Sequence, residues 1–153
     1  THAWIRMPLA NSAVAHVDFR NNLVQHWSMT ASNCESGAKG NFVNNVYRFE
    51  AWAGGKKDCA IQAVSGGEVY ASGNKFEGCS ARSTNFKSSP VFEAPPIPTD
   101  PTEAVLQKVL DETNGAGCMP RDQVDKNYLT SKEKCPSGDP AHGLQVEGSK
   151  LGK

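Results

Sequence analysis

The sequence lacks the features that mark several large classes of protein. Its 16 basic and 16 acidic residues cancel, and it contains neither a basic block nor an acidic tail, so we expect no nucleic-acid partner. The longest apolar runs are only a few residues, too short to span a membrane, so we expect no membrane partner. The length of 153 residues predicts one domain with a modest core.

Two further absences concern the cellular compartment. Residues 1–6 do not form a signal peptide and include no initiator Met, so we expect them to come from the middle of a longer chain. None of the five cysteines belongs to a CxxC pair, which disfavours zinc and favours disulfides in a secreted, extracellular protein. The odd number leaves one thiol free or paired outside this sequence, and the connectivity stays open. The cysteines are Cys34, Cys59, Cys79, Cys118 and Cys135.

What the sequence does contain is a repeated theme of asparagine before a short apolar/polar alternation. The theme occurs at 21–27, 44–49 and 73–78, and its equivalent asparagines are 23 residues apart (22 to 45) and then 29 apart (45 to 74). A period in this range, carried by strand-like segments, is typical of a solenoid in which each repeat is one coil. We therefore predict an all-β fold of stacked coils.

The alternation also predicts where the strands run. In residues 13–20, Val17 and Phe19 face one way and the polar residues face the other. The polar or Gly-rich stretches between the strands are predicted to be loops, at 28–39, 51–58 and 81–89. Further strands are expected at 23–27, 41–43, 46–49, 68–72 and 75–76.

The asparagines are expected to be part of the scaffold. Asparagine tolerates left-handed backbone angles and suits a turn. If the coils stack, equivalent asparagines lie one above another, and their side-chain amides can bond along the stack. Such bonds would satisfy the polar groups at a sharp inward corner.

After residue 92 the composition changes. We expect coils at 1–92, a Pro-rich linker at 93–101, a helical C-terminal cap at 102–135, and an extended or mobile tail at 136–153. Asp100 is expected to cap the first helix, with Pro101 at its first position and Glu103 completing a capping box. Its apolar stripe is predicted to pack on the outside or open end of the coils. The stripe is Val105, Leu106, Val109 and Leu110, with Gly115 ending this helix and Asp122 starting a second one.

Two motifs resemble the pectate lyase family. The first is Ala-Val-Leu-Gln-Lys-Val-Leu with Asn-Gly-Ala-Gly-Cys-Met-Pro-Arg-Asp-Gln-Val-Asp, within residues 104–125. It resembles the segment that closes the catalytic domain in bacterial and microbial-eukaryote members. The second is Arg6-Met7-Pro8 followed by Val-Asp-Phe-Arg-Asn-Asn at 17–22, similar to the arginine-x-proline element before the family's Asn-Asn rung. The resemblance covers most of residues 4–129 and implies the C-terminal coils of a right-handed parallel β-helix with a short α-helical cap.

The resemblance also implies an activity, the calcium-assisted β-elimination of polygalacturonate (pectate), an acidic polysaccharide. Arg6 matches the family's arginine base. A guanidinium does not normally give up its proton, so this role requires either cationic neighbours that lower its pKa or a bound hydroxide that the arginine orients. The family's Ca²⁺ ligands are expected upstream of this chain, and we assign no metal ligand within it. We expect the chain to act as a monomer together with the upstream part of the same protein.

Substrate binding is assigned to four residues. Arg20 is the first arginine after the motif that could hold the substrate carboxylate. Trp52, Lys56 and Lys57 lie on a loop that could contact an anionic ligand. The alternative is that these are solvated lysines beside a packed tryptophan.

Other functions stay open on the sequence alone. One is a noncatalytic β-helix module that binds glycans, with Trp4, Trp27 and Trp52 as stacking platforms. Another is a hydrolase of similar architecture that uses paired carboxylates, and the scarcity of closely placed acids in the strand segments argues against it.

Overall fold

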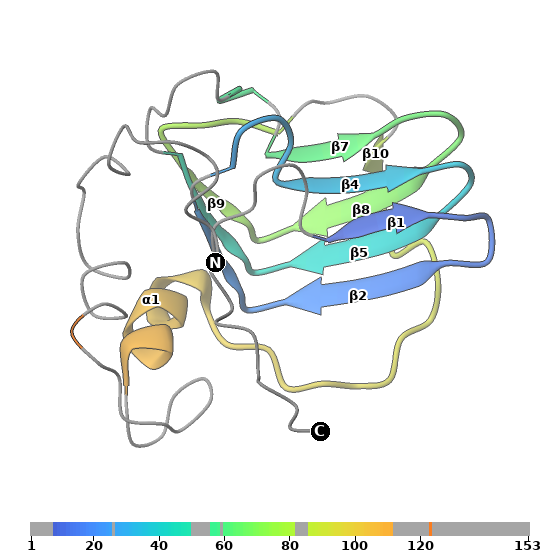
Figure 1. Ribbon diagram of the computed structural model, residues 1–153. Coiled ribbons are helices and arrows are strands. Elements are labelled where there is room, and N and C mark those ends of the chain that lie inside the picture. Colours follow the sequence, from blue (N-terminus) through green and yellow to red (C-terminus); the bar gives the residue numbers. More distant parts are fainter. Residues whose placement is uncertain are drawn as a thin grey trace, which may run out of the picture.

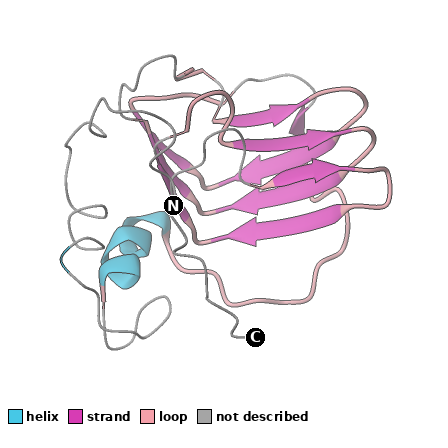
Figure 2. Cartoon of the chain, in the orientation of Figure 1, coloured by secondary structure: helices cyan, strands magenta, loops and turns pink. Residues whose placement is uncertain are grey.

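The fold is mostly β, with three parallel sheets and one short helix (Figures 1 and 2). The computed structural model describes residues 8–25, 27–49, 56–58, 60–81, 86–111 and 123. Among these residues, no helix is long or apolar enough to cross a membrane.

Over its first nine described strands the chain visits the three sheets in a fixed order and then returns to the first. Each circuit of three strands therefore adds one parallel strand to every sheet, and the tenth strand adds to the second sheet alone. The first sheet contains β1 (Leu9–Asn11), β4 (Ser32–Glu35) and β7 (Ile61–Ala63); the second contains β2 (His16–Arg20), β5 (Lys39–Val43), β8 (Glu68–Ser72) and β10 (Phe86–Lys87); the third contains β3 (Leu23–Gln25), β6 (Val46–Arg48) and β9 (Lys75–Glu77).

The strands predicted beside the asparagines are confirmed, and two of the three predicted loops are wrong. The first, 28–39, contains β4, and the third, 81–89, contains β10. β4 has the sequence Ser-Asn-Cys-Glu, which shows no apolar alternation and little intrinsic β preference. It is a strand because it pairs with both β1 and β7, so tertiary pairing overrides local propensity.

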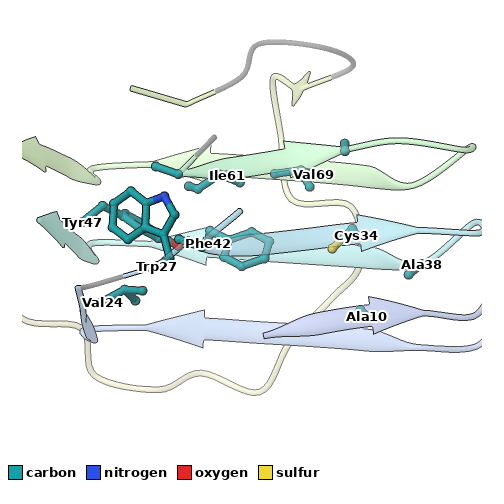
Figure 3. Packing of buried hydrophobic residues seen from close by; sticks show 12 residues of the cluster. Ala10, Val24, Trp27, Cys34, Ala38, Phe42, Tyr47, Ile61 and Val69 are labelled. Carbon is teal, nitrogen blue, oxygen red and sulfur yellow. The ribbon is translucent and has the colours of Figure 1, made fainter. Parts of the chain in front are cut away.

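The core lies in the space that the three sheets enclose (Figure 3). Trp27, Phe42, Tyr47, Ile61 and Val69 are fully buried. The rings of Trp27 and Tyr47 meet edge to face at 6.3 Å, a preferred aromatic geometry. The Tyr47 hydroxyl, which needs a partner at this depth, forms a 3.0 Å hydrogen bond with Ser32 Oγ. Burial raises the pKa of Tyr47 well above its ordinary value.

A ladder of asparagines runs through the corner between the second and third sheets, and it confirms the predicted stacking. Asn45 accepts bonds at Oδ1 from the backbone N–H (3.0 Å) and the Nδ2 (3.2 Å) of Asn22. Asn45 in turn donates its own N–H (2.9 Å) and Nδ2 (3.0 Å) to Asn74 Oδ1. Its Nδ2 also reaches Phe19 O at 2.9 Å. The asparagine side chains thus form hydrogen bonds with backbone N–H and C=O groups that have no partner strand at the turn.

A second row of residues shapes the same corner. Asn21 and Asn44 have φ values of 53° and 52°, and Gly73 has 64°, the left-handed region that asparagine and glycine tolerate best. A Cβ on Gly73 would meet Asn44 Oδ1 at 1.9 Å, so only glycine fits. Asn21 and Asn44 each donate Nδ2 to Asp100 O at 2.9 Å, which anchors the start of the C-terminal segment.

The helix α1 (Thr102–Leu110) packs outside the third sheet, against β3 and β6, as the sequence predicted. Val105 is buried there. The predicted cap is wrong, because Pro101 is the N-cap, with no side-chain cap bond, and Asp100 pairs with Lys108 Nζ at 2.6 Å. α1 ends at Leu110, before Gly115, which lies outside the described residues together with the second helix start at Asp122.

The cysteines that the structure describes, Cys34 and Cys79, are both free thiols. Burial raises the pKa of each to about 11, so both are poor nucleophiles at neutral pH. The other three cysteines lie outside the described residues. Two thiols, rather than the single one expected from the odd count, are therefore unpaired.

The ladder predicts the effect of Asn45→Ala. The substitution leaves the N–H of Asn22 and the carbonyl of Phe19 without partners, and it should lower the free energy of unfolding by about 2–4 kcal/mol. Urea denaturation followed by circular dichroism measures this. Asn11→Ala, at an exposed strand position, is the matched control and should change stability by at most about 0.5 kcal/mol. Equal effects of the two substitutions would contradict the ladder's role.

An ion-pair cluster on the third sheet predicts a pH dependence. Hydrogen bonds from Arg48 (2.8 Å) and Lys75 (2.9 Å) hold the pKa of Glu77 below its usual 4.5. Because the folded pKa is the lower one, the stabilisation is present above about pH 4.5 and is lost as the pH falls through the folded pKa. Glu77→Gln should therefore cost about 0.5 kcal/mol at pH 7 and nothing at pH 2. Urea denaturation at both pH values tests this, and a cost independent of pH would refute it.

Candidate functional site

The connections that enter the first sheet meet along one edge, because parallel strands begin at the same side. Before β7, Lys56 and Lys57 are exposed. Lys56 N donates to Ser28 O in the preceding connection at 3.1 Å, and Trp27 Nε1 donates to Lys56 O, also at 3.1 Å. Neighbouring connections are thus bonded to each other and hold the lysines at this edge.

In the sequence, Arg6 precedes β1. It lies outside the described residues, as does Trp52, but in sequence it stands only two residues before Pro8. The Pro8 carbonyl accepts a bond from Asn33 N at 3.0 Å, so the entry to β1 runs beside β4. The strand that follows Arg6 in the sequence and the strand that follows Lys56 and Lys57 therefore belong to one sheet.

The outer face of the first sheet carries a polar row. Ser32 and Cys34 point into the core, so the side chain of Asn33, between them on β4, points to the opposite face. Its register partners are Leu9 on β1 and Gln62 on β7. Thr30 Oγ1 donates to Gln62 Oε1 at 3.2 Å. This row, Asn33, Gln62 and Thr30, is called the amide row below.

Asn33 holds the one buried side-chain oxygen or nitrogen, among the described residues, that has no hydrogen-bond partner. The unpaired atom is Oδ1, on a side chain that is only 1% exposed. Its Nδ2 makes a single long bond, 3.4 Å, to Glu35 Oε2. A buried acceptor without a donor costs free energy, and such atoms commonly mark a site for water or a ligand.

Arg20 lies elsewhere, at the end of β2 on the second sheet. Its Nε donates to both oxygens of Asp18, at 2.7 and 2.9 Å, and its Nη1 donates to Thr99 Oγ1 at 3.4 Å. The structure therefore does not bring Arg20 together with Lys56 and Lys57. The guanidinium that was expected to bind the substrate carboxylate is instead paired with the carboxylate of Asp18.

A pocket of about 450 Å³ adjoins Arg20, between the second sheet and residues 90–94, and Asn41 also lines it. Asn41 Nδ2 donates to Phe92 O (3.1 Å), and its Oδ1 accepts from Val91 N (3.0 Å). His16 stacks on Phe92 with ring centroids 4.7 Å apart. These contacts fix residues 90–94 as a strap across the outer face of the sheet.

Trp27 is wrong as a stacking platform, because its side chain is 0% exposed and forms part of the core. Trp4 and Trp52 lie outside the described residues. Within the described part of the chain, no group of three His, Cys, Asp or Glu side chains is placed to hold a metal ion.

Sequence reasoning missed the amide row because β4 was taken for a loop. A signal was nevertheless present. Asn33 and Gln62 are 29 residues apart, the same spacing as the ladder pair Asn45 and Asn74. Two amides that recur with the coil period belong to one face of one sheet.

The chain was compared with protein-family models, with curated proteins and with solved structures, and none of them matches it.

The unpaired oxygen predicts an unusual effect for Asn33→Leu. An apolar side chain of similar size removes the unsatisfied acceptor, so the free energy of unfolding should rise by about 1 kcal/mol. The neighbouring Ser32→Ala, which takes the partner from the buried Tyr47 hydroxyl, should lower it by about as much. Thermal or urea unfolding of the two variants decides this, and a loss of stability in Asn33→Leu would show that the oxygen is satisfied in solution.

Proposed function

We propose that the coils form part of a right-handed parallel β-helix and that the chain is the C-terminal portion of a secreted pectate lyase. The proposed reaction is cleavage of polygalacturonate by calcium-assisted β-elimination with Arg6 as the base. The motifs at Arg6-Met7-Pro8 and in residues 104–125 support it, together with the circuit of parallel strands.

One observation carries the proposal. In the sequence, Arg6 comes shortly before β1 and the Lys56–Lys57 pair shortly before β7, and both strands belong to the first sheet. We propose that these cations lie at one edge of that sheet. An extended polyanion that lies across the coils would meet a cation from more than one of them.

The chemistry requires such an edge. When the proton next to the uronate carboxylate leaves, negative charge develops on the sugar, and fixed cations stabilise it better than water does. Lys56 and Lys57 are proposed to neutralise substrate carboxylates. In this proposal a neutral Arg6 guanidine, or a hydroxide that Arg6 orients, takes the proton next to the carboxylate. The bond from carbon to the glycosidic oxygen then breaks, a C=C bond forms at the sugar end, and the leaving oxygen takes a proton from water.

Calcium would supply further neutralisation of carboxylates. The described residues provide no group to hold it, and the proposal leaves its ligands upstream of this chain.

The decisive experiment measures the absorbance of unsaturated product on polygalacturonate, with Ca²⁺ and with a chelator. It uses the full-length protein in which this chain occurs. Arg6→Ala should lower kcat by at least about 100-fold and leave folding intact. The matched control is Arg20→Ala, which removes a guanidinium on another sheet and should change kcat less than about threefold.

Two results would reject the lyase. One is the absence of activity in the full-length protein, and the other is undiminished activity in Arg6→Ala. Binding of polygalacturonate that survives Arg6→Ala without turnover would favour the alternative, a noncatalytic glycan-binding module.

A further inference from the structure

The chain just before β7 is hydrogen-bonded to the chain that follows β9. Ser80 N donates to Lys57 O at 2.8 Å, and Ser80 O accepts from Ala60 N at 3.1 Å. Ala60 is fully buried, and its carbonyl accepts from Ser32 N of β4 at 3.0 Å. Ser32, Ala60 and Ser80 therefore lie on successive circuits, each bonded to the next as in a parallel sheet.

Two cysteines stand beside these bonds in the sequence. Cys59 directly precedes Ala60, and Cys79 directly precedes Ser80. Cys59 lies outside the described residues, but its sequence neighbours Asp58 and Ala60 are described. Segments bonded in this way run about 4.8 Å apart, and a disulfide joins Cα atoms that are about 4.4–6.8 Å apart. The bonded residues that follow the two cysteines are therefore at a separation that one disulfide spans.

The thiol of Cys79 faces the interior of the coils. Its Sγ donates to Tyr47 O at 3.3 Å, and its side chain packs against the buried core. On the neighbouring circuit, Ile61 and Ala63 of β7 are buried. The alternation of β7, continued back along the sequence, predicts the same inward direction for Cys59.

Cys34 has no cysteine beside it on the described strands. It lies in the core (Figure 3), and its register partners are Ala10 on β1 and Ala63 on β7. Of the two described thiols, Cys79 is therefore the one whose neighbouring circuit carries a cysteine in the matching part of the sequence.

We propose that Cys59 and Cys79 form a disulfide when the protein folds in an oxidising compartment. The bridge would join residues 20 positions apart in the sequence and fasten the connection that carries Lys56 and Lys57 to the following circuit. The consequence for the lysines deepens the proposed function and rests on it, whereas the pairing itself does not depend on the lyase reaction.

The chemistry is a thiol–disulfide exchange with a disulfide oxidant, for which oxidised glutathione is the probe. One cysteine thiolate attacks the oxidant and releases a glutathione thiol, and the second cysteine displaces the other glutathione from the mixed disulfide. The two cysteines thus pass two protons and two electrons to the oxidant, and one S–S bond forms. In the folded chain, burial raises the pKa of Cys79 to about 11, so we expect the bridge to form during folding.

The test refolds the full-length protein in which this chain occurs in a mixture of reduced and oxidised glutathione. Free thiols are then alkylated, and the protein is digested with trypsin without reduction. Cleavage after Lys and Arg leaves each cysteine of this chain on its own peptide, with Cys59 on residues 58–75 and Cys79 on residues 76–82. Mass spectrometry should find these two peptides joined and the peptide of Cys34 alkylated.

Matched variants check that the joined peptides report this pair. Cys59→Ser and Cys79→Ser should each leave the other cysteine alkylated, and Cys34→Ala should leave the bridge intact. The thermal unfolding midpoint should fall by about 5 °C in either serine variant. The double variant should fall no further, because the same single bridge is lost in all three.

Three results would overturn the proposal: alkylation of both cysteines after oxidative refolding, a link from Cys79 to Cys118 or Cys135 instead, or additive losses of midpoint in the double variant. None of these readouts measures lyase activity, so failure here is distinguishable from failure of the proposed function.

Discussion

The structure depends on the hydrogen bonding of buried asparagine amides at one sharp corner. Where the chain leaves the second sheet for the third, backbone groups turn inward and lose their partners in the strands. Asn45, which is fully buried, supplies an acceptor to the coil before it and donors to both neighbours. Without these amides the corner would bury several unpaired polar groups, each costing about 1–3 kcal/mol.

The corner also aligns neighbouring strands of the second and third sheets, because its bonds join residues of successive circuits. The same corner anchors the C-terminal segment through Asp100, so the strap and α1 cover outer faces of the second and third sheets. Lys56 and Lys57 precede β7 of the first sheet, and Arg6 precedes β1 of that sheet in the sequence. The asparagine corner thus belongs to the scaffold, and the proposed cationic edge belongs to the first sheet.

The part of the fold that could be predicted from the sequence is the part with a local signature. Alternation and asparagine pairs marked the strands on either side of the ladder, and the ladder itself followed from their period. β4 could not be predicted in this way, because Ser32, Asn33 and Cys34 are buried through pairing with β1 and β7 rather than through their own pattern. The amide row was missed with it. Arg20 was expected to bind substrate because the sequence alone does not show that its guanidinium forms an ion pair with Asp18.

The predicted N-cap of α1 was wrong for a related reason. Asp100 has the residue type of an N-cap, yet its backbone is bound by Asn21 and Asn44 and its carboxylate by Lys108. Long-range partners 56 and 79 residues away decided its conformation. Local rules are reliable in this chain where no distant group competes for the same atoms.

The central claim, that asparagine amides hold the coils together, is tested most directly by hydrogen exchange of the side-chain amides, followed by NMR. The account predicts that the Nδ2 protons of Asn45 and Asn74 exchange far more slowly than those of the exposed Asn11, at rates close to those of backbone amides in β5. Exchange of the Asn45 side chain as fast as that of Asn11 would contradict it.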